Sequence, residues 1–169
     1  YYTYSVNENK RCVMELKEFK SHVKIIDRES CDTLRNNYIN CFVNTTHPLY
    51  VPQIQTKHKF VDGLCYLGYL WDYIKNPIIV EEPFFDEVAS KIKTVYAFWD
   101  IHSCERILIK NYWKFGKETV LKLNFQTLLE GEDFLPEDIY IFDDSMTWTL
   151  IKTHEDIQGK RYCLKSGDI

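Results

Sequence analysis

A histidine and a group of carboxylates near the C-terminus are the side chains best suited to acid–base or metal chemistry. Glu155 and Asp156 follow His154 directly, and Asp143 and Asp144 precede the same predicted strand. Imidazoles and carboxylates are the common general acids and bases of hydrolases and nucleases. Neighbouring strand residues point to opposite faces, however, and an extended strand places Asp144 and His154 roughly 30 Å apart. We therefore interpret the group as a hydrogen-bonded strand end, with catalysis by His154 and Glu155 as the alternative.

Cysteine chemistry has less support in this chain. A Cys104 nucleophile with His102 as its base would be close neighbours in sequence, whereas such pairs normally meet across the fold. The six cysteines include no C-x-x-C and no zinc-type Cys/His pairing, so we predict reduced thiols, most of them in the core. Motifs for phosphate loops, dinucleotides, serine hydrolases and zinc proteases are missing too. We predict no catalytic residue, no metal and no cofactor, and hence a protein that works by binding.

Aromatic residues interspersed with carboxylates form candidate surfaces for a basic protein partner. Aromatic side chains supply contact area at low entropic cost, and carboxylates supply steering and specificity. Three groups have this composition: Tyr69, Trp71, Asp72 and Tyr73; Asp143, Asp144 and Trp148; and Glu130, Glu132, Asp133, Glu137 and Asp138. For Trp71 and Trp148 we favour packing in the core, and for residues 130–138 a solvated loop is the default interpretation.

The elements that must position these residues begin with helices. Apolar residues at helical spacing predict helices over residues 13–23, 30–42 and 64–74, the second of them capped by Ser30. The sequence Glu81-Glu82-Pro83 predicts the start of a fourth helix, because acids and proline favour the first turn. The end of this helix is open, since residues 95–101 fit a strand equally well.

The second half of the chain changes to strand periodicity. Residues 121–125 alternate between apolar and polar, and residues 139–142, 147–153 and 161–165 read as short strands separated by turns. Helices followed by a meander are typical of the α+β class. We predict N-terminal helices packed on a C-terminal antiparallel β-meander, with residues 1–169 forming a single domain.

The bulk composition limits the class of partner. Hydrophobic residues make up 45% and charged residues 27% of the 169 positions, as in an ordinary globular protein. The formal net charge of -4 disfavours nucleic-acid binding and is compatible with a basic protein partner. No run approaches the roughly 18 apolar residues of a membrane span. The first residues also lack the order of a signal peptide, so we expect a cytoplasmic location without membrane contact.

A C-terminal pattern resembles a known signature. Asp138-Ile139-Tyr140-Ile141-Phe142-Asp143 is followed by Trp148-Thr149, by Thr153-His154-Glu155 and by Gly159. This is similar to the signature D-x-Y-x-x-D, then W-T, then T-H-E, of small bacterial proteins of unassigned function. Several such families are similar to immunity proteins, which are encoded beside secreted or contact-dependent toxins. The resemblance is confined to the C-terminal pattern and does not extend to the N-terminal hundred residues.

The resemblance implies an intracellular bacterial protein that blocks a toxin or holds it in an inactive complex. A basic nuclease is one class of toxin that suits an acidic inhibitor. The alternatives are a small hydrolase or nuclease that uses His154 with nearby carboxylates, and a regulatory or scaffolding module. For the signature residues themselves we favour a structural role, in which they build the hairpin.

Overall fold

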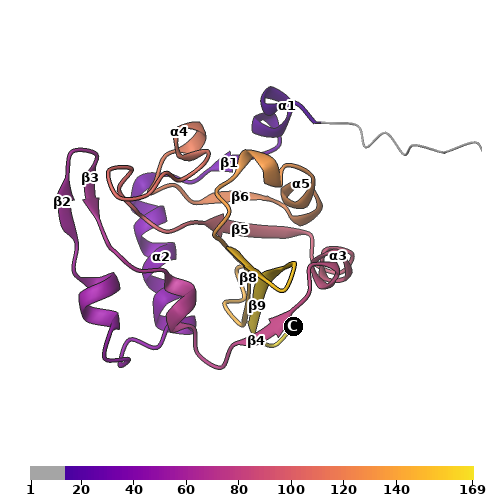
Figure 1. Ribbon diagram of the computed structural model, residues 1–169. Coiled ribbons are helices and arrows are strands. Elements are labelled where there is room, and N and C mark those ends of the chain that lie inside the picture. The colour runs from indigo at the N-terminus through magenta and orange to yellow at the C-terminus, as the bar shows by residue number, and fades with distance from the viewer. Residues whose placement is uncertain (1–13) are drawn as a thin grey trace, which may run out of the picture.

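A seven-stranded antiparallel sheet is the centre of the fold, as the computed structural model, which describes residues 14–169, shows (Figure 1). The strands lie in the order β1-β6-β5-β7-β8-β9-β4. Their bounds are β1 Lys24–Ile25, β4 Ile78–Val80, β5 Thr94–Phe98, β6 Leu121–Asn124, β7 Ile139–Phe142, β8 Trp148–Ile157 and β9 Lys160–Gly167. A separate two-stranded hairpin consists of β2 His58–Phe60 and β3 Gly63–Cys65.

Helices cover both faces of this sheet (Figure 1). The α-helices are α1 Leu16–Ser21, α2 Arg28–Phe42, α3 Pro83–Ala89, α4 Tyr112–Phe115 and α5 Phe125–Glu130. Three short helical segments add to them: η1 Val51–Gln55 and η2 Leu70–Tyr73 lie between α2 and α3, and η3 Glu132–Phe134 follows α5. No helix in the part that the structure describes is both long enough and apolar enough to cross a membrane.

The alternation of side chains along the strands produces two hydrophobic layers. On one face, Phe98 and Phe142 pack with Tyr38 of α2, whose ring lies 4.8 Å from Phe98 and 5.2 Å from Phe142. On the other face, the strands contact residues of α1, α3 and α5, such as Phe19 and Phe85. Each fully buried Phe contributes about 2–3 kcal/mol relative to an exposed one. Both faces of the central strands are therefore buried, and this fixes their register.

The coarse prediction of a mixed helix-and-sheet fold is confirmed, and the sheet contains the predicted meander β7-β8-β9. The prediction for β7 matches residue for residue, while β8 and β9 extend further than predicted. The sheet also takes strands from outside the predicted meander and before residue 100, namely β1, β4 and β5. Helix and strand were both open for residues 95–101, and of these residues 95–98 belong to β5, inside the sheet.

One helix prediction in the first half is wrong, two others are confirmed with different ends, and the fourth helix begins at Pro83 as predicted. The helix predicted over residues 64–74 is instead the end of β3 followed by the short segment η2. Buried side chains, above all Asp100, hold this stretch by accepting its backbone N–H groups, as described below. The helix predicted from residue 13 begins at Leu16, and Val13 itself lies outside the described residues. The cap of α2 is Asp27, whose side chain accepts the N–H of Ser30 at 2.9 Å.

The cysteines are distributed between core and surface. Cys31, Cys65 and Cys163 are buried, as small core residues should be, whereas Cys41 and Cys104 are exposed. The helical spacing of apolar residues over 30–42 predicts a buried position for Cys41 as well, and this is wrong because Cys41 is exposed. These five thiols are free, and Cys12 lies outside the described residues.

Candidate functional site

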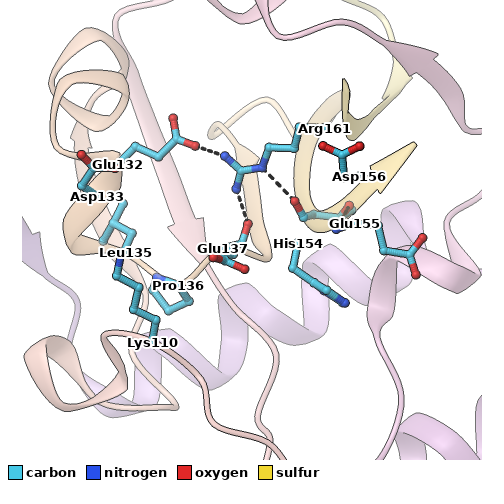
Figure 2. Close-up of a pocket in the computed structure, with 11 residues that line it drawn as sticks. Lys110, Glu132, Asp133, Leu135, Pro136, Glu137, His154, Glu155, Asp156 and Arg161 are labelled. Carbon is cyan, nitrogen blue, oxygen red and sulfur yellow. Dashed lines mark hydrogen bonds and ion pairs between the residues drawn. The ribbon is translucent and has the colours of Figure 1, made fainter. Parts of the chain in front are cut away.

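An acidic cleft with a volume of about 310 Å³ lies between the loop around η3 and the turn end of the β8–β9 hairpin (Figure 2). We call it the acidic cleft throughout. Its lining residues are Lys110, Glu132, Asp133, Leu135, Pro136, Glu137, Thr153, His154, Glu155, Asp156 and Arg161. Five of these carry a carboxylate and two carry a permanent positive charge, so negative charge dominates the cleft.

An irregularity in β8 explains how consecutive residues come to line one cleft. The register between β8 and β9 shifts between Lys152 and Asp156, as in a β-bulge. A bulge redirects side chains that would otherwise alternate between the two faces of a strand. The expectation that His154 and Glu155 point to opposite faces is therefore wrong, because both of them line the cleft. The hydroxyl of Thr153 donates to the Tyr162 carbonyl at 2.8 Å and fixes the distorted strand.

One arginine organises the floor of the acidic cleft. Arg161 Nε donates to the Thr153 carbonyl at 2.8 Å, Nη2 donates to the Glu137 carbonyl at 2.6 Å, and Nη1 bonds to Glu132 (Figure 2). Glu132 also accepts from the buried Lys152 ammonium at 2.8 Å. Arg161 and Lys152 are thus engaged with Glu82, Glu132 or backbone carbonyls. Lys110, the other cation of the lining, forms no ion pair within residues 14–169, and one lysine does not balance the four remaining carboxylates.

The rest of the cleft carries unbalanced negative charge. Within residues 14–169, the side chains of Asp133, Glu137 and Glu155 form no ion pair and no hydrogen bond. Burial, followed by the negative charge of Glu155, raises the pKa of the nearby Asp72 carboxyl. Burial and then Asp138 raise the pKa of the Tyr69 hydroxyl to about 12. Like charges gathered in this way favour a cationic ligand.

Behind the cleft wall, Asp138 connects two parts of the chain that are distant in sequence. Its carboxylate accepts from Trp71 Nε1 at 3.0 Å, from the His154 backbone N–H at 3.0 Å and from His154 Nδ1 at 2.9 Å. A carboxylate beside Nδ1 favours the tautomer that carries its proton there. Tyr69 stacks on Trp71 with ring centroids 5.3 Å apart and lies 5.0 Å from the His154 ring. Asp138 therefore holds both η2 and His154 in place.

A second buried carboxylate supports the same segment. Asp100 is 2% exposed and accepts from the Tyr66 hydroxyl at 2.8 Å, the Leu70 N–H at 3.0 Å and the Tyr140 hydroxyl at 2.7 Å. The Tyr140 hydroxyl in turn accepts the Trp71 N–H at 3.0 Å. These bonds satisfy backbone groups that a helix would otherwise pair internally. They account for the failure of the helix prediction over residues 64–74.

The stability of the protein should fall as pH rises through the pKa of Asp100. Burial raises the pKa of this carboxyl from its ordinary 3.8 to about 6 in the folded chain. Between these values the folded state binds more protons than the unfolded state, so the free energy of unfolding decreases with pH. Relative to Asp100→Asn, which cannot ionise, the wild type should lose about 2–3 kcal/mol between about pH 4 and pH 7.

Urea unfolding of both proteins at four pH values across this range measures the difference. The asparagine keeps an acceptor for Tyr66 and Leu70, and the titration of all other carboxylates cancels in the comparison. A difference that stays flat, or that grows with pH, would show that Asp100 does not titrate as a buried acid.

The structure separates the three predicted partner-binding groups. Of the first group, Trp71 and Tyr73 are buried, while Tyr69 is half-buried and Asp72 is exposed. Asp143 and Asp144 lie at the opposite end of the hairpin from His154, where Asp144 is 3.8 Å from Lys122. Their neighbour Trp148 is buried, as is Trp71, so core packing is confirmed for both tryptophans.

The third group divides at the cleft. Glu132, Asp133 and Glu137 line it, whereas Glu130 lies on α5 and accepts from Gln126 at 3.3 Å. Asp138 is buried behind the wall and joins the first group to His154 and Glu155. The cleft thus combines members of the third group with the residues predicted as an alternative site.

Among the charged lining residues, Lys110 and Arg161 were not predicted, and Asp156 was considered only as a neighbour of His154. Asp156 and Arg161 are cross-strand partners in the β8–β9 hairpin. An opposite-charge pair flanking the turn at Gly159 was the available sequence signal for them. For Lys110 the sequence contains no such signal, because its loop reaches the cleft only through the tertiary fold.

Most residues of the C-terminal signature make internal contacts. Tyr140 bonds to Asp100, Thr149 bonds to the Tyr38 hydroxyl at 2.7 Å, and Thr153 bonds to the Tyr162 carbonyl. Glu155 differs, since it lines the cleft and its carboxylate has no internal partner among the described residues. Apart from Glu155, these contacts agree with the interpretation that the signature builds the hairpin.

No protein-family model, curated protein or solved structure matches this chain. Among the described residues, no three His, Cys, Asp or Glu side chains are grouped as metal ligands. The function is therefore inferred from the geometry and charge of the cleft.

Proposed function

We propose that this chain is an immunity-type protein that binds and neutralises a basic toxin inside the bacterial cell, and that the toxin docks on the acidic cleft. The observation that carries the proposal is the excess of carboxylates in the cleft over available cations. Asp133, Glu137 and Glu155 project from a framework that Arg161 and Asp138 keep rigid. A partner with lysine or arginine side chains supplies the missing counter-charges.

The chemistry of the cleft suits a basic enzyme surface. Toxins that cleave nucleic acids need positive charge to bind phosphate, and an acidic inhibitor is attracted to that charge and covers it. A volume of about 310 Å³ accommodates a long basic side chain of the partner. The ring of Tyr69 lies 5.0 Å from the ring of His154, which lines the cleft. A tyrosine face near the cleft stabilises a bound guanidinium.

A second candidate function, a small hydrolase or nuclease, rests on the pairing of His154 with Asp138. A histidine whose Nδ1 is held by a buried carboxylate is the arrangement that general bases use. His154 is 35% exposed at its side chain, so water and substrate can reach it. Within residues 14–169, no serine, threonine or cysteine side chain bonds to its ring. The binding proposal therefore takes precedence, with a regulatory or scaffolding role as the remaining alternative.

Coexpression with the tagged product of the neighbouring gene tests the binding proposal. We expect a stoichiometric complex that survives affinity and size-exclusion chromatography, and whose enzymatic activity returns when this chain is removed. Complex formation should weaken with added salt, because exposed charges are screened within about 8 Å at physiological ionic strength. A neighbour that does not bind, or that binds without losing activity, would contradict the proposal. His154→Ala would then test the hydrolase alternative.

A further inference from the structure

A second cavity with a volume of about 390 Å³ lies between α2, η1 and the end of β5. It shares no lining residue with the acidic cleft. Its most unusual component is Arg35, which projects from α2 and is 8% exposed. The guanidinium lies 4.7 Å from the centre of the Phe98 ring. The cavity is therefore a concave site with a buried positive charge.

The charge of Arg35 has no acidic partner within residues 14–169. Nη2 donates to the carbonyls of Trp99 at 3.0 Å and Lys117 at 3.2 Å, and no carboxylate forms an ion pair with the side chain. Nε is buried and has no hydrogen-bond partner. Nη1 makes no hydrogen bond either, but unlike Nε it is not sealed from solvent. A buried cation is costly unless an anion compensates it.

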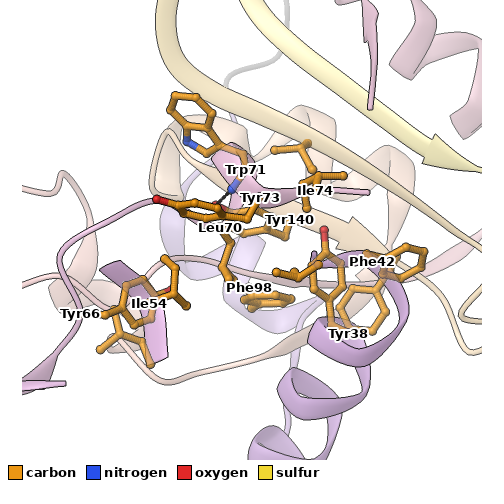
Figure 3. Packing of buried hydrophobic residues seen from close by; sticks show 14 of the residues in the cluster. Tyr38, Phe42, Ile54, Tyr66, Leu70, Trp71, Tyr73, Ile74, Phe98 and Tyr140 are labelled. Carbon is orange, nitrogen blue, oxygen red and sulfur yellow. Dashed lines mark hydrogen bonds between the residues drawn. The ribbon is translucent and has the colours of Figure 1, made fainter. Parts of the chain in front are cut away.

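The remaining walls are suited to an apolar body. Ile39, Ile54 and Ile101 supply aliphatic surface, and Tyr50, Tyr66 and Phe98 supply ring surface. Figure 3 shows Ile54 and Tyr66 next to each other at one end of this buried cluster, with Phe98 nearby. Tyr50 is 7% exposed, and its hydroxyl makes no hydrogen bond among the described residues. Tyr50 therefore offers a second donor among the residues that line the cavity.

The rim of the cavity limits the charge of its ligand. Asp32 and Glu118 both line it and outnumber the one lysine of the lining, Lys57. Glu118 is 3.7 Å from Arg28 on the outer surface. Their negative charges disfavour multiply charged anions such as phosphate esters, because like charges repel across a short distance. A single negative charge can still reach Arg35, which lies deeper than either acid.

From these observations we infer that the cavity is a binding site for a small aromatic monocarboxylate. The carboxylate accepts from Arg35 Nη1 and the Tyr50 hydroxyl, and the ring occupies the space between the isoleucine and tyrosine side chains. Pockets of about 300–1,000 Å³ with apolar walls and a few converging polar groups are typical of small-ligand sites. The inference is independent of the toxin-binding proposal, because it concerns a different cavity.

Titration of the isotope-labelled chain with benzoate, followed by two-dimensional NMR, tests this site. Benzoate should shift the signals of residues around α2 and η1 with a dissociation constant of about 1 mM. Benzamide, which has the same shape without the charge, and inorganic phosphate should each bind at least about 10-fold more weakly. Arg35→Met should weaken benzoate binding by at least about 10-fold, whereas Arg28→Met, at an exposed position of the same helix, should not change it.

A second variant keeps the inference testable if Arg35→Met does not fold. Gln55→Trp places a large ring at the mouth of the cavity from an exposed position and leaves Arg35 intact. It should also weaken benzoate binding by at least about 10-fold. The inference is overturned if benzoate at about 10 mM leaves the signals around α2 and η1 unshifted. Benzoate binding equally well to Gln55→Trp and the wild type would overturn it as well.

Discussion

Replacing Asp138 by alanine is expected to lower the free energy of unfolding by about 3 kcal/mol. The change leaves the buried indole N–H of Trp71 and the N–H groups of His154 without their acceptor. An unsatisfied buried donor costs about 1–3 kcal/mol, and here more than one donor is affected. Urea unfolding monitored by tryptophan fluorescence measures the loss.

Two further variants identify the cause of that loss. Asp138→Asn retains one acceptor oxygen for Trp71 and should cost only about 1 kcal/mol. Asp133→Ala removes an exposed carboxylate of the same cleft and should stay within about 0.5 kcal/mol of the wild type. If Asp138→Ala were as stable as Asp133→Ala, Asp138 would not hold η2 and His154 in place.

Reversing two charges of the acidic cleft should abolish most of the partner's affinity. In the double variant Glu137→Lys with Glu155→Lys, two attractive contacts to a basic partner become repulsive. Close charge pairs across an interface contribute about 1.5–7 kcal/mol, so we expect binding at least about 100-fold weaker. Neither side chain has an internal partner among the described residues, so stability should not change. Calorimetric titration with the neighbouring gene product measures the affinity.

A matched variant distinguishes the effect of where the charges lie from the effect of the net charge on affinity. Glu18→Lys with Glu87→Lys changes the net charge equally, but both residues are exposed on the helices α1 and α3, outside the cleft. It should reduce affinity by less than about 5-fold, through long-range attraction alone. Equal losses in the two double variants would mean that the partner senses overall charge and does not dock on the cleft.

The strands of the second half were predictable because local pattern and tertiary burial agree there. Residues 139–142 lie on a central strand between two turns, and their composition already indicates a strand. Residues 64–74 show the opposite case. Their apolar residues do have helical spacing. The Asp100 carboxylate, however, accepts a hydrogen bond from the Leu70 N–H, and the Tyr140 hydroxyl accepts one from the Trp71 N–H. No local pattern reveals acceptors that lie so far away in sequence.

The candidate site was predictable only in part for the same reason. Trp71 and Asp138 are separated by 67 positions, and their contact depends on the pairing of β7 with β8 and on the path of η2. The bulge that turns His154 and Glu155 into one cleft contains no glycine and has no clear sequence signal. Arg35 is different, because it shares the buried face of its helix with Cys31, Tyr38 and Phe42. A charged residue at an apolar position was a signal that the sequence did contain.

An inhibition titration tests the central claim most directly. The purified neighbouring gene product is assayed for its enzymatic activity while this chain is added in increasing amounts. The account predicts a linear loss of activity that is complete at one equivalent of the wild-type chain. It predicts little loss at the same concentration of the Glu137→Lys, Glu155→Lys variant. Undiminished activity with excess wild-type chain, or equal inhibition by the variant, would contradict neutralisation of a basic partner through the acidic cleft.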